Sequence, residues 1–186
     1  MGESAISGFL RKTLGSSLYR HSRGVSEMAV MLADFYGAER DVVQVAGLWH
    51  DYGKSFSFSE LKKKARVLGF PRDSLYLTSP QLLHAPLGAA LICRDAGIRD
   101  LRVLRAVYYH TTGASGLRMA EKIVYLADAI EENRSYPGVE KLRKMAFIDF
   151  EAALLEVIDN TIKRVILKDG LLHPHSVAFR NEMVRR

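Results

Sequence analysis

The chain has 186 residues, of which 48% are hydrophobic and 26% charged, as expected for a globular protein that buries one core. Its single cysteine, Cys93, excludes an intramolecular disulfide and is compatible with a reducing compartment. The formal charge of +6 favours an anionic partner. Because no apolar run approaches the roughly 18 residues of a membrane helix and no signal-like segment opens the sequence, we expect a cytoplasmic protein without membrane contact.

Helical periodicity is found nearly everywhere in the sequence. In residues 21–37 the apolar side chains recur at the spacing of a buried stripe, which contains Val25, Met28, Met31, Leu32 and Phe35. Gly37 is a natural stop for this helix. The next helix, residues 40–50, contains Ala46 and Gly47, which are small enough to let another helix approach closely.

The remaining helices are expected at about 59–68, 85–96, 100–110, 118–133 and 149–168. The stretches 79–86 and 110–116 are rich in Ser, Thr, Gly and Pro and are expected as loops. Because the β-branched runs are short and do not alternate, the sequence predicts an all-α fold in a single domain.

The stretch GLWHDYGK places His50 and Asp51 side by side at the end of an apolar helix. Neighbouring residues on a helix point about 100° apart, so the two cannot support each other as an i,i+4 pair. A helix end, or a ligand on which both side chains converge, would explain them.

The chain contains six histidines, and four of them lie on or beside predicted helices: His21, His50, His84 and His110. Of these, His84 precedes Pro86, a residue type that starts helices well. A carboxylate, Asp128, lies within the apolar helix AEKIVYLADAIEENR, where burial is costly unless the charge is paired or ligates a metal. A salt bridge to arginine is one interpretation. Imidazoles and carboxylates together also suit Zn, Fe or Mn in a helical bundle.

The order of these residues, His21, His50-Asp51 and Asp128, resembles the H…HD…D pattern of the HD superfamily of metal-dependent phosphohydrolases. The segments HDYGK, YHTTG, AEKIVYLADAIEENR, GVEKLRKMA and LLHPHSVAFRN are similar to the bacterial YqeK-type HD proteins over nearly the whole chain. The resemblance implies a symmetrical bis(5′-nucleosyl)-tetraphosphatase, which cuts diadenosine tetraphosphate into two ADP. It also implies one HD domain over residues 1–186, a helical bundle with the metal site in its core at about 16–135. The helices of 137–186 would complete the nucleotide pocket.

Carried over by position, the resemblance implies a divalent metal, usually iron, with Mn or Zn as options. Its ligands would be His21, His50, Asp51 and Asp128. A second ion, if present, would be held by His84 and His110, which could instead touch phosphate. The catalytic set would be Asp51, Lys54, His84 and His110. The implied nucleotide contacts are Lys54, His84, Tyr109, His110, Asp128, Arg134, Leu171, Leu172, His173, Pro174 and His175.

The chain departs from the family pattern at one position. An arginine usually lies three residues before the first histidine, where this sequence has Leu18, and Arg20 is the nearest replacement. Other residues keep two interpretations. Lys54 can be a solvated lysine, and Arg134 can interact with the dipole at the C-terminus of its helix. Glu131 and Glu132 can face solvent or orient a ligand histidine.

Several functions remain open at this point. A metal-dependent hydrolase of dinucleoside polyphosphates is favoured over an HD phosphohydrolase of another nucleotide, a nucleotide-binding sensor without turnover, and an RNA-associated basic module. The densest basic cluster, residues 61–66, is short, so nucleic acid is not expected as a partner. A homodimer is an option. Because ligand imidazoles must be neutral, activity should fall as the pH drops through their titration range.

Overall fold

The computed structural model describes residues 3–70 and 74–185, which form helices joined by turns. Its elements are α1 (Glu3–Tyr36), α2 (Arg40–Trp49), η1 (Tyr52–Ser55), α3 (Phe58–Val67), η2 (Leu75–Thr78), α4 (Pro80–Ala96), α5 (Leu101–Tyr109), α6 (Met119–Ile130), α7 (Val139–Met145), α8 (Phe150–Leu167) and α9 (Pro174–Val184). No β-strand occurs within these described ranges, so the all-α prediction is confirmed. None of the described helices is both long and apolar enough to cross a bilayer.

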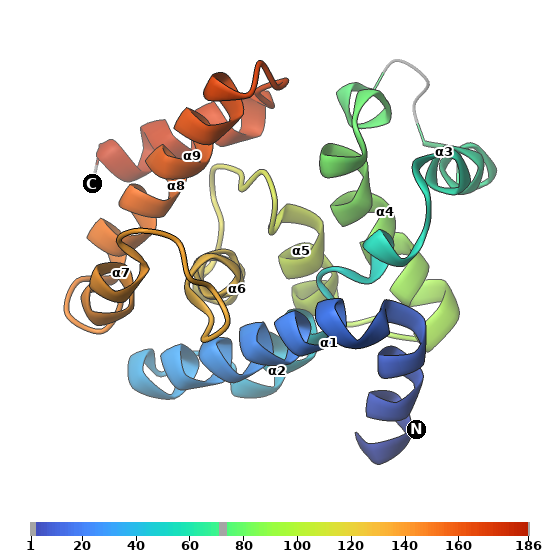
Figure 1. Ribbon diagram of the computed structural model, residues 1–186, viewed down its shortest axis with the longest axis horizontal. Coiled ribbons are helices and arrows are strands. Elements are labelled where there is room, and N and C mark those ends of the chain that lie inside the picture. The colour runs from blue at the N-terminus through green and yellow to red at the C-terminus, as the bar shows by residue number, and fades with distance from the viewer. Residues whose placement is uncertain (1–2, 71–73, 186) are drawn as a thin grey trace.

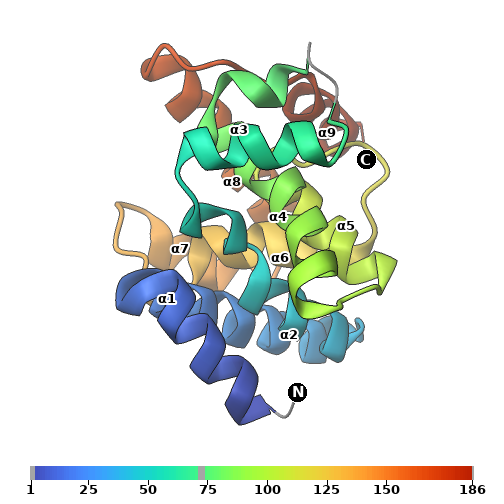
Figure 2. The ribbon, with the colours of Figure 1, turned by 90° about the vertical axis from the view of Figure 1, so that its right-hand side faces the viewer.

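The helices surround α6, which runs through the middle of the bundle. In Figure 1, α1 and α2 lie together along the lower edge, with α7, α8 and α9 to one side and α3, α4 and α5 to the other. Figure 2, turned by 90°, keeps α1 and α2 below and α3 above, with α6 between them. This arrangement brings residues that are far apart in the sequence toward one centre.

The contact between α1 and α2 depends on a glycine. A Cβ at Gly47 would lie 2.8 Å from the Cα of Ser26 and 2.9 Å from its nitrogen, so the two backbones touch there. Beside this point, Val25 and Ala29 are fully buried. The prediction that small residues of α2 permit a close helix approach is therefore confirmed. The contact also sets the distance between His21 on α1 and His50 at the end of α2.

Replacing Gly47 with Ala should destabilise the protein by about 1–3 kcal/mol, because an extra methyl group must push two helix backbones apart. Denaturant unfolding of the variant measures this loss. Gly8→Ala is the matched control within α1, since nothing lies within 4 Å of a Cβ there. That control should be neutral or stabilising by about 0.5–1 kcal/mol. Equal unfolding midpoints for the two variants would contradict the close packing.

The predicted stripe of the first long helix is wrong at two positions. Met31 and Phe35 are 54% and 61% exposed, whereas Ala29 and Ala33 are fully buried. The helices approach too closely for bulky side chains at every apolar position, so alanines take the inner face. Phe35 packs on the surface instead, edge-on to Phe147.

The predicted loop at 79–86 is also wrong, because α4 begins at Pro80 rather than at Pro86. The Ser79 hydroxyl accepts a hydrogen bond from the Gln81 amide, and Pro80 fits the first turn, where no N–H donor is needed. This cap starts the helix five residues before the predicted start at residue 85 and leaves Pro86 inside it. Consequently His84 projects from a helix rather than from a loop.

Other boundaries differ where local signals were missed. The loop at 110–116 is confirmed, since α5 ends at Tyr109 and α6 begins at Met119. However, α6 ends at Ile130 rather than near residue 133, because Glu131 adopts an extended ψ of 159°. Helix α1 begins near the start of the chain, and within the expected helices of 137–186 the bounds of α7 and α9 were not predicted. Within α1, Gly15 has φ 73° and ψ 167°, which produces the bend seen in Figure 1.

Candidate metal centre

Two helices and the end of a third bring the predicted ligands together. His21 comes from α1, His50 and Asp51 from the end of α2, and Asp128 from the last turn of α6. His21 Nε2 lies 3.0 Å from Asp128 Oδ1 and 3.7 Å from Asp51 Oδ2. His50 Nε2 lies 3.3 Å from Asp51 Oδ2 and 3.9 Å from Asp128 Oδ1. These nitrogen and oxygen atoms lie close enough together for one cation to contact several of them.

The other oxygen of Asp51 faces a second pair of histidines. Asp51 Oδ1 lies 3.3 Å from His84 Nε2 and 3.4 Å from His110 Nε2. The two imidazole nitrogens are themselves 3.1 Å apart, and the Thr111 hydroxyl lies within 3.2 Å of both. Asp51 thus stands between two donor groups, each of a size that could hold an ion: His21, His50 and Asp51 form one, and Asp51, His84 and His110 the other.

Each of these histidines is oriented by its own helix or by a neighbour. His50 Nδ1 donates to the Gly47 carbonyl at 2.7 Å, His110 Nδ1 to the Val107 carbonyl at 2.8 Å, and His84 Nδ1 to the Pro80 carbonyl at 3.2 Å. A carbonyl oxygen only accepts, so Nδ1 carries the proton and the Nε2 lone pair faces Asp51. That tautomer is the one a metal needs.

Two buried polar atoms in this cluster have no hydrogen-bond partner among the described residues: His50 Nε2 and Asp51 Oδ1. Both residues are fully buried. Leaving such groups unpaired is costly, and they normally have a partner or bind an ion. The donor set of neutral imidazoles and carboxylates therefore fits a divalent cation, and the cluster is able to hold one.

The charges and pKa shifts of the cluster favour the binding of a cation. Burial alone would raise the pKa of Asp51, but the neighbouring imidazoles of His50, His110 and His84 lower it well below its usual range. Burial opposes protonation of His50, yet Asp51 and Asp128 raise the pKa of that imidazole. Burial lowers the pKa of His110 to about 4, which keeps this imidazole neutral. Asp51 and Asp128, whose pKa values are both lowered, supply the negative charge that attracts a cation.

A cleft of about 520 Å³ opens onto one side of the cluster. Two cations lie at its edge. Lys54 Nζ is 2.7 Å from Asp51 Oδ2, and Arg134 Nη2 is 2.6 Å from Asp128 Oδ1. Both side chains are partly exposed, at 43% and 38%. They can therefore turn from the carboxylates to an anion that enters the cleft. The residues lining the cleft are Leu14, Gly15, Ser16, Ser17, Leu18, His21, Asp51, Lys54 and Arg134.

Leu18 lines the cleft, whereas Arg20 is exposed and is not among its lining residues. The structure therefore places no arginine from this part of α1 in the cleft, and Arg20 is not a direct replacement. The neighbouring residues Gly15, Ser16 and Ser17 were not predicted as site residues. The bend at Gly15 is what brings them to the opening, and a Gly-Ser-Ser sequence before a helical stripe was the available signal.

The predicted nucleotide-contact residues near the C-terminus form a separate aromatic cluster. His173 stacks on Tyr76 with ring centroids 4.5 Å apart, and His175 lies 4.5 Å from His173. Tyr109 lies 5.7 Å from His175, so this cluster adjoins the turn that carries His110. His173 is buried, Leu172 partly buried, and Leu171 and Pro174 exposed. None of residues 171–175 lines the 520 Å³ cleft. Moreover, Pro174 and His175 begin α9 rather than lying in a loop.

Glu131 resolves one of the open interpretations. Its side chain is buried, and Oε1 lies 3.1 Å from His21 Nδ1. Oε2 accepts hydrogen bonds from the Asn133 amide at 2.7 Å and from its side-chain nitrogen at 2.8 Å. A Cβ at Gly24 would overlap this carboxylate, so the glycine makes room for it. Glu132, in contrast, is exposed.

Replacing Glu131 with Gln should weaken metal binding about 10–100-fold, because His21 would lose the carboxylate that fixes its ring and tautomer. Titration of the metal-free protein with Mn²⁺ or Co²⁺ against a competing chelator measures the affinity. Glu132→Gln removes the same charge from the adjacent, exposed position and should leave the affinity unchanged. An equal loss in both variants would point to overall charge instead of the orientation of His21.

Comparisons with known proteins agree with this geometry. The HD domain family model matches residues 18–133, the segment that contains all of the clustered histidines and carboxylates. A symmetrical bis(5′-nucleosyl)-tetraphosphatase of Halalkalibacterium halodurans is 38% identical over 89% of this chain and 88% of that protein. Its counterpart in Bacillus subtilis is 36% identical over 94% of both chains.

The solved structures include a similar protein. The crystal structure of a protein from Clostridium acetobutylicum, described as a predicted HD superfamily hydrolase involved in NAD metabolism, has a TM-score of 0.94 with this chain. The two are 37% identical, and the match covers 100% of this chain and 98% of the other.

Proposed function

The chain belongs to the HD domain family, in the group of the symmetrical bis(5′-nucleosyl)-tetraphosphatases, and on this premise we propose that it hydrolyses dinucleoside polyphosphates. The preferred substrate is diadenosine tetraphosphate, and the products are two molecules of ADP. The protein is accordingly a hydrolase of phosphoanhydride bonds.

The observation that carries the proposal is the combination of a buried donor cluster with an open cationic cleft. The cluster has two unpartnered atoms, His50 Nε2 and Asp51 Oδ1. A purely structural metal site is closed by four protein ligands, whereas here the cleft reaches Asp51 and His21. Lys54 and Arg134 at the edge of the cleft supply charges that a structural site would not need.

The residues of the chain have distinct roles in this proposal. A divalent cation, when bound by His21, His50, Asp51 and Asp128, supplies charge neutralisation and water activation. Arg134 presents a planar fork suited to two phosphate oxygens, and Lys54 a single mobile charge. His84 and His110, which face Asp51, would hold a second cation. The closed side of the cluster excludes bulk water, which strengthens each of these interactions.

We place one nucleoside at the aromatic cluster of Tyr109, His173 and His175, where rings can stack on a base. In this arrangement the segment 137–186 completes the nucleotide site of one domain that spans residues 1–186. We propose iron as the resident metal and the cytoplasm as the compartment. A dimer would be compatible with this proposal but is not required by it.

The function is tested by removing the metal and restoring it. Chelated protein should not hydrolyse diadenosine tetraphosphate, and Fe²⁺ should restore more activity than Mn²⁺ or Zn²⁺. Parallel assays with nucleoside triphosphates, deoxynucleotides and NAD examine the other substrates of an HD phosphohydrolase. If a competing substrate were turned over faster, the substrate assignment would be wrong. Tight binding of diadenosine tetraphosphate by the metal-loaded protein without turnover would instead indicate a sensor.

A further inference from the structure

The end of α6 carries three residues that reach the metal centre or its cleft. Asp128 lies in the last turn, and the helix stops two residues later because Glu131 leaves the helical conformation. The turn of residues 131–134 then directs Glu131 to His21 and Arg134 to Asp128. The conformation of this turn therefore determines how a predicted ligand and a phosphate-binding cation are presented.

Helix ends leave carbonyl groups without partners, and here side chains from further along the chain supply them. Arg134 Nε donates to the Asp128 carbonyl at 2.8 Å, and the Tyr136 hydroxyl donates to the Ala129 carbonyl at 2.9 Å. The next carbonyls are bound from α7, a helix that the metal centre itself does not use.

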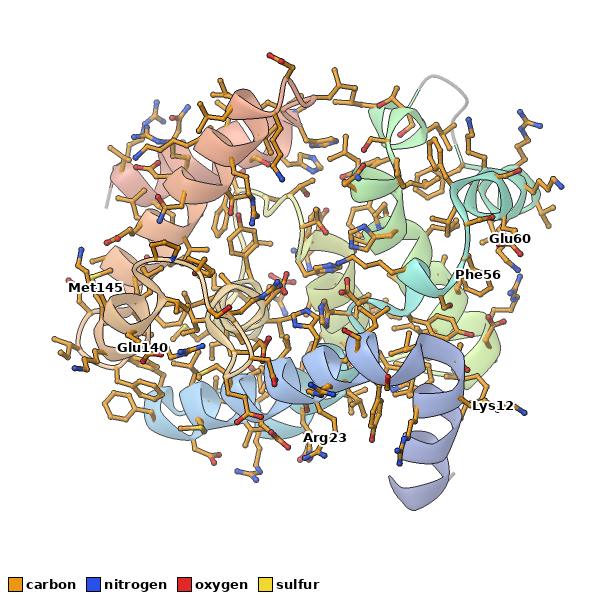
Figure 3. The ribbon with its side chains drawn as sticks, in the orientation of Figure 1. Lys12, Arg23, Phe56, Glu60, Glu140 and Met145 are labelled. Carbon is orange, nitrogen blue, oxygen red and sulfur yellow. The ribbon has the colours of Figure 1, made fainter. Side chains whose placement is uncertain are left out.

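Arg143 on α7 makes these bonds. Its Nε donates to the Ile130 carbonyl at 2.8 Å, and its Nη2 donates to the Glu131 carbonyl at 2.6 Å and to the Arg134 carbonyl at 2.8 Å. Nη1 pairs with Glu140, which is labelled on α7 in Figure 3. The Arg143 side chain is 17% exposed. One planar group thus binds the last residue of the helix and both ends of the turn.

We propose that Arg143 is a positioning residue of the metal centre, holding the turn 131–134 so that Glu131 orients His21 and Arg134 reaches the cleft. The inference rests on the proposed function only in taking His21 as a metal ligand. A lysine cannot reproduce the role, because a single ammonium lacks the rigid fork in which two nitrogens donate to three carbonyls. The favourable charge at a helix C-terminus adds to the contact but does not require this geometry.

The test compares Arg143→Ala and Arg143→Lys with Lys144→Ala, which removes a charge from the next, exposed position of α7. Competition with a chelator measures Mn²⁺ or Co²⁺ affinity. Heteronuclear NMR measures whether His21 keeps its proton on Nδ1. We expect Arg143→Ala to lose affinity about 10–100-fold, as for loss of an outer-shell partner, and to populate both His21 tautomers. Arg143→Lys should lie between this variant and wild type, and Lys144→Ala should match wild type.

Chemical rescue separates positioning from simple helix capping. Millimolar guanidinium should restore the metal affinity of Arg143→Ala, whereas methylammonium, with the same charge but no fork, should not. The proposal is overturned if Arg143→Ala has a lower melting temperature but an unchanged metal affinity and His21 tautomer. If Arg143→Ala does not fold, Arg143→Lys with wild-type affinity overturns it equally. Failure of the proposed function would look different: wild-type protein would bind metal and leave diadenosine tetraphosphate intact.

Discussion

Replacing Asp51 with Asn is expected to abolish metal binding and hydrolysis together. Asp51 is fully buried, and its two oxygens face different histidine groups, with Oδ2 beside His50 and His21 and Oδ1 beside His84 and His110. The amide keeps the shape but removes the charge shared by both groups. Loss of several kcal/mol of charge stabilisation corresponds to a fall in kcat/KM of about a thousandfold or more.

The fold should survive this substitution. The amide has nearly the same shape as the carboxylate, although the variant loses the ion pair with Lys54 and a charge whose lowered pKa shows that the fold stabilises it. Circular dichroism should show wild-type helicity, with a lower melting temperature for the metal-free variant. Asp159→Asn, which loses an ion pair with Arg180 far along the chain, is the control and should keep both metal and activity. Full activity in Asp51→Asn or Asp51→Ala would end the metal hypothesis.

Replacing His110 with Gln should lower the metal content from two ions to one and reduce activity roughly a hundredfold, as when one transition-state-stabilising group is lost. The reason is that His84 and His110 both face Oδ1 of Asp51, although His110 also lies close enough to His50 and Asp128 to share a cation with them. The group on the other side, with His21, His50 and Asp128, stays intact. Elemental analysis of the purified variant measures the content.

His84→Gln should give the same stoichiometry as His110→Gln, since the two imidazoles face one oxygen and lie 3.1 Å apart. If wild-type protein contained a single ion and both variants kept it while KM rose, the two histidines would be phosphate contacts. That outcome would contradict the second cation but leave the first site in place.

The sequence predicts the residues at the centre of this site more clearly than the residues around them. A neighbouring His50 and Asp51 at a helix end, and Asp128 in an apolar helix, conflict with ordinary burial, and such conflicts are visible without a structure. Their partners His21, His84 and His110 could be added because each lies at a helix end or on a helix face. The all-α fold followed from a periodicity that is strong over most of the chain.

The residues that were missed act through contacts between distant segments. Glu131 could not be told apart from the exposed Glu132 in the sequence, because the space for its carboxylate is made by Gly24 on another helix. Arg143 contacts carbonyls 9–13 residues earlier in the chain, and a hydrogen bond from a side chain to the backbone cannot be predicted from a pattern of side chains. Pro86 was misread as a helix start because Ser79 and Pro80 supply a stronger one. Met31 and Phe35 were misplaced because periodicity does not measure how closely two helices approach.

Product analysis in ¹⁸O-labelled water tests the central claim most directly. Metal-loaded wild-type protein is incubated with diadenosine tetraphosphate. The nucleotides are then separated by chromatography, and their masses are measured by mass spectrometry. We expect ADP as the only product, with the label on the terminal phosphate of one ADP for each substrate cleaved. Formation of ATP and AMP, or intact substrate beside fully metal-loaded protein, would contradict the account.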